Sequence, residues 1–168
     1  MAILSGQFTK ALESIEPSSD DKANAKSAHE EVRAVIARAD ALSAWDADTV
    51  LIGSYRRDVS IRRVKDVDVF CRMAAIEDEA APSTVLNKFF TVLDAELGTD
   101  AAGTPRVRRQ ARSLTVEFPS YDLHVDVVPA RRRLDGYWEI PTRDGEWQAT
   151  NPENLTALKS AMNDTYNG

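Results

Sequence analysis

Two aspartates separated by one residue stand in a short apolar stretch of this sequence, Asp66-Val67-Asp68-Val69-Phe70-Cys71. Because side chains alternate along a strand, Asp66 and Asp68 would share one face while the two valines point to the other. Two carboxylates in contact repel each other by about 1–4 kcal/mol near a protein surface, and a divalent cation turns this repulsion into attraction. Hard oxygen ligands suit Mg²⁺, so the pair predicts a metal site. The alternative interpretation is the end of a strand that faces water.

A third carboxylate, Asp126, lies in a similar apolar segment, Val125-Asp126-Val127-Val128. Upstream of the aspartate pair, the apolar residues 49–52 are followed by Gly53 and Ser54. A glycine lets the backbone pass close to a ligand, and a serine hydroxyl with exposed N–H groups can hold a phosphate. If the strands lie side by side, three carboxylates converge next to a phosphate-binding turn. Such an arrangement fits two-metal phosphoryl or nucleotidyl transfer.

These motifs resemble the DNA polymerase β-type nucleotidyltransferase superfamily, whose pattern is Gly-Ser, then Asp-x-Asp, then a separate acidic strand. Within it, the sequence resembles the bacterial cGAS/DncV-like (CD-NTase) cyclic-oligonucleotide synthases, which are related to oligoadenylate synthase. The resemblance spans roughly residues 45–155 and includes the stretch 145–152, which reads Gly-Glu-Trp-Gln-Ala-Thr-Asn-Pro. It departs from the family after Arg57, where Asp58 and Val59 stand in place of the usual Gly-Thr.

The resemblance implies an α/β (α+β) nucleotidyltransferase core, with a mixed, twisted sheet that carries the carboxylates and helices packed mainly on one face. It implies that Asp66 and Asp68 bind two Mg²⁺ ions, for which Mn²⁺ could substitute. Asp126 would bind the metal at the attacking hydroxyl and assist the loss of its proton. All three aspartates are therefore both metal ligands and candidate catalytic residues.

The nucleotide would be held upstream of the metals. By resemblance, Gly53 and Ser54 hold the β- and γ-phosphates, and Arg57 reaches the triphosphate. We expect most of the other basic residues before Asp66 to lie in a solvated loop. His124 alternates onto the face of the third aspartate, and there we favour a structural role over a contact with substrate.

The implied reaction transfers a nucleoside monophosphate from an NTP, ATP or GTP, to a hydroxyl with release of pyrophosphate. The implied product is a cyclic or linear oligonucleotide second messenger in antiphage signalling. The motifs do not separate this from transfer to tRNA, protein or an antibiotic. Asp58 and Val59 also leave open a regulatory protein that binds nucleotide without turnover. A purely structural module would show no Mg²⁺-dependent affinity for NTPs.

Composition narrows the choice of partners. The 168 residues include 43% hydrophobic and 29% charged residues, which suits a single soluble domain with a substantial core. The net charge of −6 argues against broad duplex binding, which depends on Lys and Arg.

Cys71 is the single cysteine, so an intramolecular disulfide is excluded and a packed thiol is expected. Without a signal peptide or a long apolar run, we expect a cytoplasmic protein that does not bind membranes.

The whole chain, residues 1–168, reads as one catalytic core in three parts. Residues 1–45 would form N-terminal helices, 46–150 the sheet with the active site, and 151–168 the start of a C-terminal helical part. The family normally continues into a helical second domain. We therefore expect a core fragment, or a minimal form that a second copy or a partner protein completes.

Local patterns predict the elements around the site. Ser18-Ser19-Asp20 predicts the start of a helix that runs to about Leu42 and leaves His29 on the surface. Ser83 predicts the cap of a second long helix, which Gly98 would end. Further along, we expect strands at about 107–118 and 122–128, a solvated connection beginning with the three arginines 131–133, and short strands at 137–140 and 146–148.

Overall fold

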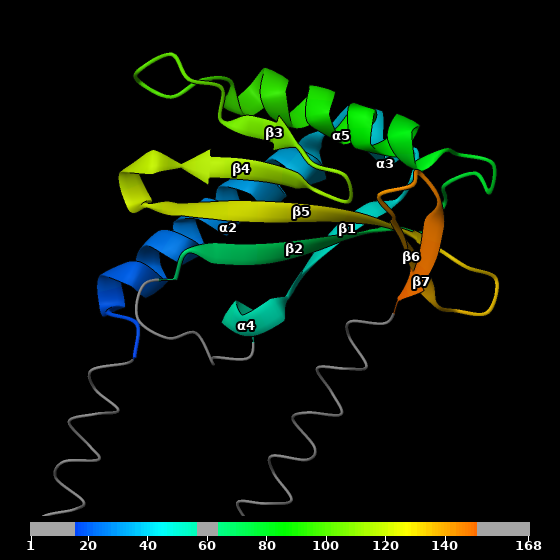
Figure 1. The fold of residues 1–168 in the computed structure, drawn as a ribbon, viewed down its shortest axis with the longest axis horizontal. Helices are drawn as coiled ribbons and strands as arrows, with labels where there is room; N and C mark the ends of the chain where they lie inside the picture. The colour runs from blue at the N-terminus through cyan, green and yellow to red at the C-terminus, as the bar shows by residue number, and fades with distance from the viewer. Residues whose placement is uncertain (1–15, 57–63, 151–168) are drawn as a thin grey trace, which may run out of the picture.

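The long N-terminal helix is set by its cap and by one apolar stripe. The computed structural model of the protein describes residues 16–56 and 64–150 (Figure 1). Helix α2 spans Ser19–Arg38, and the Ser18 hydroxyl accepts a hydrogen bond from the backbone N–H of Asp21, whose carboxylate accepts one from the Ser18 N–H. This capping box pairs donors that no helical carbonyl reaches. The helix ends before Ala39, which is extended, and α3 (Asp40–Ser43) follows, so the prediction of one helix to Leu42 was wrong.

One mixed sheet forms the centre of the described residues. Its strands are β1 (Ala47–Ile52), β2 (Asp66–Met73), β3 (Val107–Arg109), β4 (Leu114–Phe118), β5 (Leu123–Arg132), β6 (Trp138–Pro141) and β7 (Trp147–Thr150). The order is β1-β2-β5-β4-β3, and outside this order β6 pairs with the end of β5 and with β7. β2 and β5 are parallel, whereas the other pairs are antiparallel. The predicted α/β class with a mixed, twisted sheet is confirmed (Figure 1).

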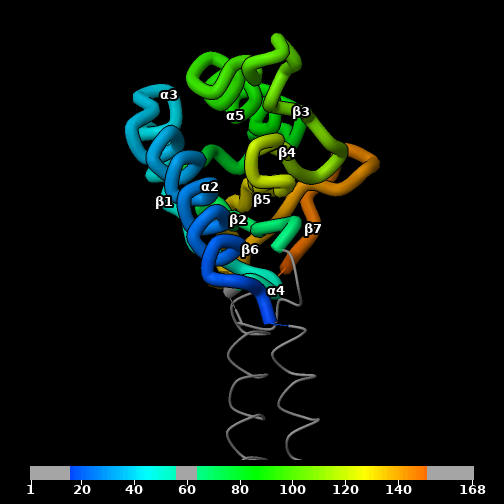
Figure 2. The backbone as a smooth tube through the Cα atoms, turned by 90° about the vertical axis from the view of Figure 1, so that its left-hand side faces the viewer, coloured from blue at the N-terminus to red at the C-terminus, as the bar shows by residue number. Residues whose placement is uncertain are grey.

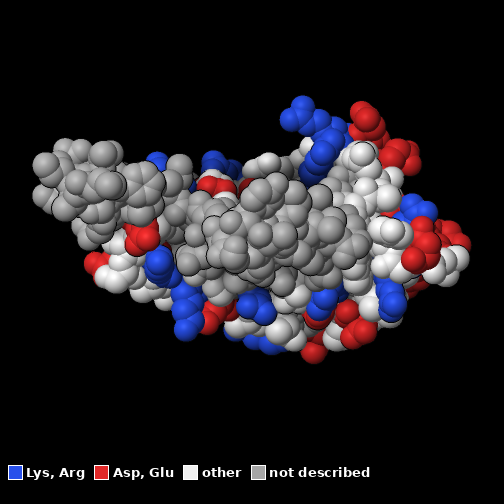
Figure 3. Space-filling view, turned by 90° about the horizontal axis from the view of Figure 1, so that it is seen from below, with Lys and Arg blue, Asp and Glu red and all other residues white. Residues whose placement is uncertain are grey.

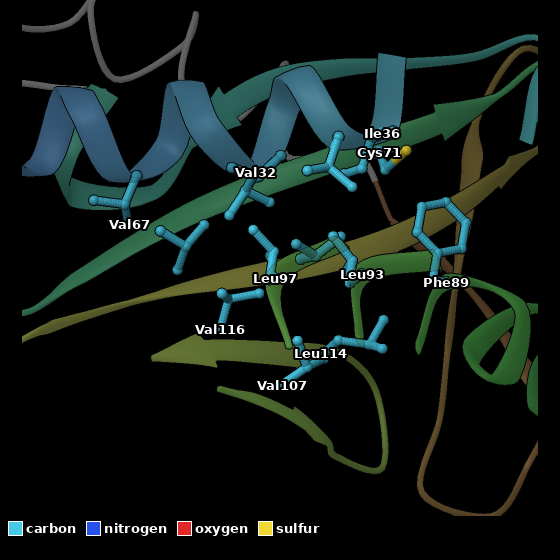
Figure 4. Close-up of a cluster of buried hydrophobic side chains, with 14 of the residues drawn as sticks. Val32, Ile36, Val67, Cys71, Phe89, Leu93, Leu97, Val107, Leu114 and Val116 are labelled. Carbon is cyan, nitrogen blue, oxygen red and sulfur yellow. The ribbon is translucent and has the colours of Figure 1, made fainter. Parts of the chain in front are cut away.

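Helices α2 and α5 (Pro82–Leu97) bury their apolar stripes on the same face of this sheet. Figure 4 shows Val32 and Ile36 of α2 beside Val67 and Cys71 of β2. Burying a valine or leucine side chain contributes about 1.5–3 kcal/mol, so this layer fixes which face of each strand looks inward. The remaining core comes mainly from Val69, Val85, Phe89, Leu93, Leu97, Leu114, Val116, Val125 and Val127.

The ends of α5 confirm one prediction and correct another. Gly98 ends the helix with a φ of 55°, as expected for a C-terminal glycine. Ser83 is not the cap, because the helix begins at Pro82 after an N-cap at Ala81. Proline at the first helical position lacks only an N–H that would have no helical partner.

The segment predicted as one strand over residues 107–118 is a hairpin. β3 and β4 pair antiparallel, and the Gln110 N–H donates to the Ser113 carbonyl over 2.9 Å at the turn between them. The short helix η1 (Pro119–Tyr121) then leads into β5. Gln110, Arg112 and Ser113 are polar and interrupt the apolar alternation, and this interruption marks the turn.

Arg131 was expected in a solvated connection, but it lies within β5 and only 17% of its side chain is exposed. Its Nε donates to Glu139 over 2.7 Å, and its guanidinium lies 4.7 Å from the centre of the Trp147 ring. A guanidinium can pair with a carboxylate and stack on an aromatic ring at the same time. Arg131 therefore joins β5 to the β6–β7 hairpin.

The face of the protein seen in Figure 3 carries both kinds of charge. On the visible part of the face in Figure 3, Lys and Arg side chains are interspersed with Asp and Glu. Exposed ion pairs, such as Arg38 with Glu96, also occur among the described residues. None of the described helices is both long enough and apolar enough to span a bilayer.

His29 is buried in the structure, contrary to the prediction of a surface position. It is 5% exposed, and its ring meets that of Tyr55 edge-on, with centroids 5.6 Å apart. Tyr55 belongs to α4 (Gly53–Arg56), a single turn after β1 that lies near the N-terminal half of α2 (Figures 1 and 2). Burial, and next the charge of Arg33, lower the pKa of His29, and its Nδ1 has no hydrogen-bond partner within the described structure.

The burial of His29 predicts a loss of stability in mild acid. Below about pH 6.5 the histidine of the unfolded chain takes up a proton, while the buried ring stays neutral to lower pH. The unfolded state then binds more protons, so the free energy of unfolding falls as the pH falls. We expect His29→Phe to reduce this fall between pH 7.5 and 5.5, measured by urea denaturation.

The other histidine provides the control for this prediction. His124 is half-exposed on the opposite side of the sheet, and His124→Gln should leave most of the dependence in place. An equal fall in the wild type and in His29→Phe would contradict the assignment to His29.

Candidate active site

The turn after β1 places a glycine against a carboxylate. Gly53 has a φ of 74°, a conformation that glycine adopts without strain. A Cβ at this position would lie 2.0 Å from Oδ2 of Asp68, so the backbone at Gly53 touches that carboxylate directly. Ser54 follows in α4 and is half-buried. The structure thus brings together Gly53, Ser54 and Asp68, which the sequence placed in one site.

The parallel pairing of β2 with β5 sets two of the predicted carboxylates side by side. Asp68 is in register with Asp126, and Asp66 is in register with His124. The buried residues between them, such as Val67 and Val125, face the helices, so the aspartates lie on the opposite face. Asp68 and Asp126 are half-buried, whereas Asp66 is exposed at the start of its strand.

These residues fit a metal in their chemistry. Carboxylate oxygens are the hard donors that Mg²⁺ and Mn²⁺ prefer, and Asp68 and Asp126 offer them from adjacent strands. Within residues 16–56 and 64–150, however, no three His, Cys, Asp or Glu side chains are grouped closely enough to hold an ion as they stand. The register brings the three strand positions together, but the side chains do not form a complete ligand set.

Asp126 is held by a residue that the sequence did not single out. The hydroxyl of Thr115, on the neighbouring strand β4, donates to Oδ1 of Asp126 over 2.6 Å. Gln110 in turn donates its side-chain amide N–H to the Thr115 hydroxyl oxygen. Alternation along the strand could have shown from the sequence that Thr115 lies on the face opposite to its apolar neighbours. Its alignment with Asp126 depends on the register of β4 with β5, which the sequence alone does not show.

His124 lies on the same face as Asp126, as the alternation predicted. Its Nε2 is 4.0 Å from Oδ2 of Asp126, and 37% of the histidine side chain is exposed. His124 therefore lies next to Asp126. Its structural role stays a prediction. Arg57, the predicted triphosphate contact, falls outside the described residues.

Comparison with known proteins identifies relatives along most of the chain. The family described as the second messenger oligonucleotide or dinucleotide synthetase (SMODS) domain matches residues 1–163. A cyclic AMP-AMP-AMP synthase from Acinetobacter sp. is 31% identical over 172 residues, which cover 96% of this chain and 47% of that protein. The chain thus spans about half the length of this curated relative.

Solved structures show the same fold. The CdnE c-UMP-AMP synthase of Rhodothermus marinus, solved with Apcpp and Upnpp, matches with a TM-score of 0.64 and 21% identity, over 85% of this chain and 56% of its own. The CD-NTase CdnG of Bradyrhizobium diazoefficiens, solved with GTP, matches with a TM-score of 0.64 and 20% identity, over 86% of this chain and 42% of its own.

The contact between Gly53 and Asp68 can be tested with two glycines of similar conformation. Gly136 has a φ of 85°, but a Cβ there would meet nothing within 4 Å. Gly136→Ala should therefore lose only the conformational term, about 1–2 kcal/mol of unfolding free energy. Gly53→Ala should lose at least about 1 kcal/mol more, because its Cβ must displace the carboxylate.

Urea denaturation of the two variants measures this difference in the free energy of unfolding. Equal losses would mean that the Asp68 carboxylate is not held against the Gly53 backbone in the folded protein.

Proposed function

The chain belongs to the family of second messenger oligonucleotide or dinucleotide synthetase domains, and we propose that it is a metal-dependent nucleotidyltransferase. The observation that carries this proposal is the register of β2 and β5, which sets Asp68 beside Asp126 and against Gly53. Adjacent carboxylates next to a glycine turn suit the presentation of a triphosphate to an attacking hydroxyl.

Asp66, Asp68 and Asp126 would hold two divalent cations, Mg²⁺ or Mn²⁺. When bound, such ions neutralise the triphosphate and lower the pKa of the attacking hydroxyl. Without them, the paired carboxylates would repel both each other and the substrate.

The chain's own groups then orient the substrate and receive the proton. The hydroxyl oxygen forms a bond to the α-phosphorus of the NTP, the bond from that phosphorus to the oxygen bridging to the β-phosphate breaks, and pyrophosphate leaves. The proton passes to Oδ2 of Asp126, because Oδ1 already accepts a hydrogen bond from Thr115. Gly53 and Ser54 would hold the β- and γ-phosphates, with Ser54 as a donor, and Arg57 would pair with a further oxygen.

The relatives suggest the substrates and product. One is named a cyclic AMP-AMP-AMP synthase, and another, 21% identical, a c-UMP-AMP synthase. We therefore take ATP or GTP as substrates and a second nucleotide as the acceptor. The product would be a cyclic or linear oligonucleotide that acts as a second messenger in antiphage defence.

Incubation of the full-length natural protein with all four NTPs and Mg²⁺ or Mn²⁺ tests the proposal, with products identified by mass spectrometry. We expect oligonucleotide products and pyrophosphate from the wild type. Asp126→Asn should lower the rate about 100-fold or more, since it removes both a ligand charge and the proton acceptor.

Asp48→Asn is the matched control for Asp126→Asn. Asp48 lies on β1, in register with Arg72 of β2, with which it forms an ion pair away from the proposed site. This variant removes the same charge from the same sheet and should keep its rate. ATP binding by calorimetry without any product, unchanged in Asp126→Asn, would instead indicate a nucleotide-binding regulatory protein.

A further inference from the structure

A relay of two side chains leads from the β3–β4 turn to the carboxylate of Asp126. Thr115 is the second residue of β4 and is 4% exposed. Its hydroxyl donates to Oδ1 of Asp126, and its oxygen accepts from the side-chain amide of Gln110. A threonine hydroxyl has one hydrogen, so an N–H bond to its lone pair leaves that hydrogen for the carboxylate. The direction of the relay is therefore defined.

The relay leaves the two oxygens of Asp126 in different environments. Oδ1 is engaged by a buried hydroxyl at 2.6 Å. Oδ2 lies on the side of His124, whose Nε2 is 4.0 Å away and whose side chain is 37% exposed. One oxygen therefore accepts a hydrogen bond from the neighbouring strand, and the other lies toward the partly exposed His124.

We propose that Thr115, itself held by Gln110, is a positioning residue that keeps Oδ2 of Asp126 directed at the metal and the attacking hydroxyl. This inference rests on the proposed function. A hydrogen bond to an ionised oxygen is stronger than one between neutral groups, and such outer partners orient metal-binding carboxylates. A carboxylate free to rotate would spend less time in the productive orientation.

The variant Thr115→Val tests the proposal, because it keeps the shape of the side chain and removes the hydroxyl. The affinity for Mn²⁺ without nucleotide is measured from free Mn²⁺ in EPR spectra, and kcat and KM are measured with NTPs. We expect Mn²⁺ affinity to fall about 10-fold and kcat to fall about 10–100-fold, with KM for the NTP nearly unchanged. Thr115→Ser keeps the hydroxyl and should restore both values.

Thr49→Val is the matched control. Thr49 lies on β1, and its hydroxyl accepts from Nε of Arg33 on α2 over 2.9 Å, on the helix-covered face. This variant also removes a bonded hydroxyl from the sheet, so it should lower stability without changing Mn²⁺ affinity or kcat.

Each outcome decides the proposal. A folded Thr115→Val with wild-type Mn²⁺ affinity and kcat would overturn it, as would a wild type that binds no Mn²⁺. Loss of both in Thr49→Val as well would reduce Thr115 to a structural role. Mn²⁺ binding that depends on Thr115, in a full-length protein that makes no product, would refute the proposed transfer reaction and leave the positioning of Asp126 standing.

Discussion

The structure depends on the parallel pairing of β2 with β5. This register places Asp68 directly beside Asp126, which without a cation costs about 1–4 kcal/mol of repulsion. On the other face of the same two strands, valines such as Val67 and Val125 are fully buried, and each contributes about 1.5–3 kcal/mol. A slip by one residue would expose these valines and bury the aspartates. The hydrophobic core thus holds the carboxylates together.

The two faces of the sheet have different roles, one in the hydrophobic core and the other in the proposed site. Helices α2 and α5 cover one face and supply the core. Figure 4 shows side chains of both helices in this core, such as Ile36 of α2 and Leu93 of α5. The other face carries the aspartates at the start of β2 and near the start of β5. Packing against the helices fixes the β-strands, so the polar residues on the opposite face need few contacts of their own to stay in place. Family membership, shown over residues 1–163, agrees with this arrangement.

Much of the fold followed from local patterns, whereas features set by contacts between distant elements did not. Alternation correctly placed Asp68 and Asp126 away from the core, and a family resemblance supplied the fold. Thr115 could not be recognised as a partner of Asp126, because their contact depends on the pairing of β4 with β5. His29 was wrongly expected on the surface, because the pattern of one helix does not reveal that α4 packs on it. Arg131 was wrongly expected in a solvated connection, because its partners lie on β6 and β7.

The connection between β2 and β5 also has a consequence for how the protein folds. A parallel pair needs a crossover, and here α5, β3 and β4 all intervene along the chain between the two strands. Contacts of such long range form slowly, because the entropy of closing the loop must be lost before they stabilise the chain. During synthesis, β1 and β2 leave the ribosome well before the strand that completes the carboxylate pair. A nascent chain that holds only these first strands therefore has Asp66 and Asp68 but not Asp126, and the repulsion between Asp68 and Asp126 is absent from it.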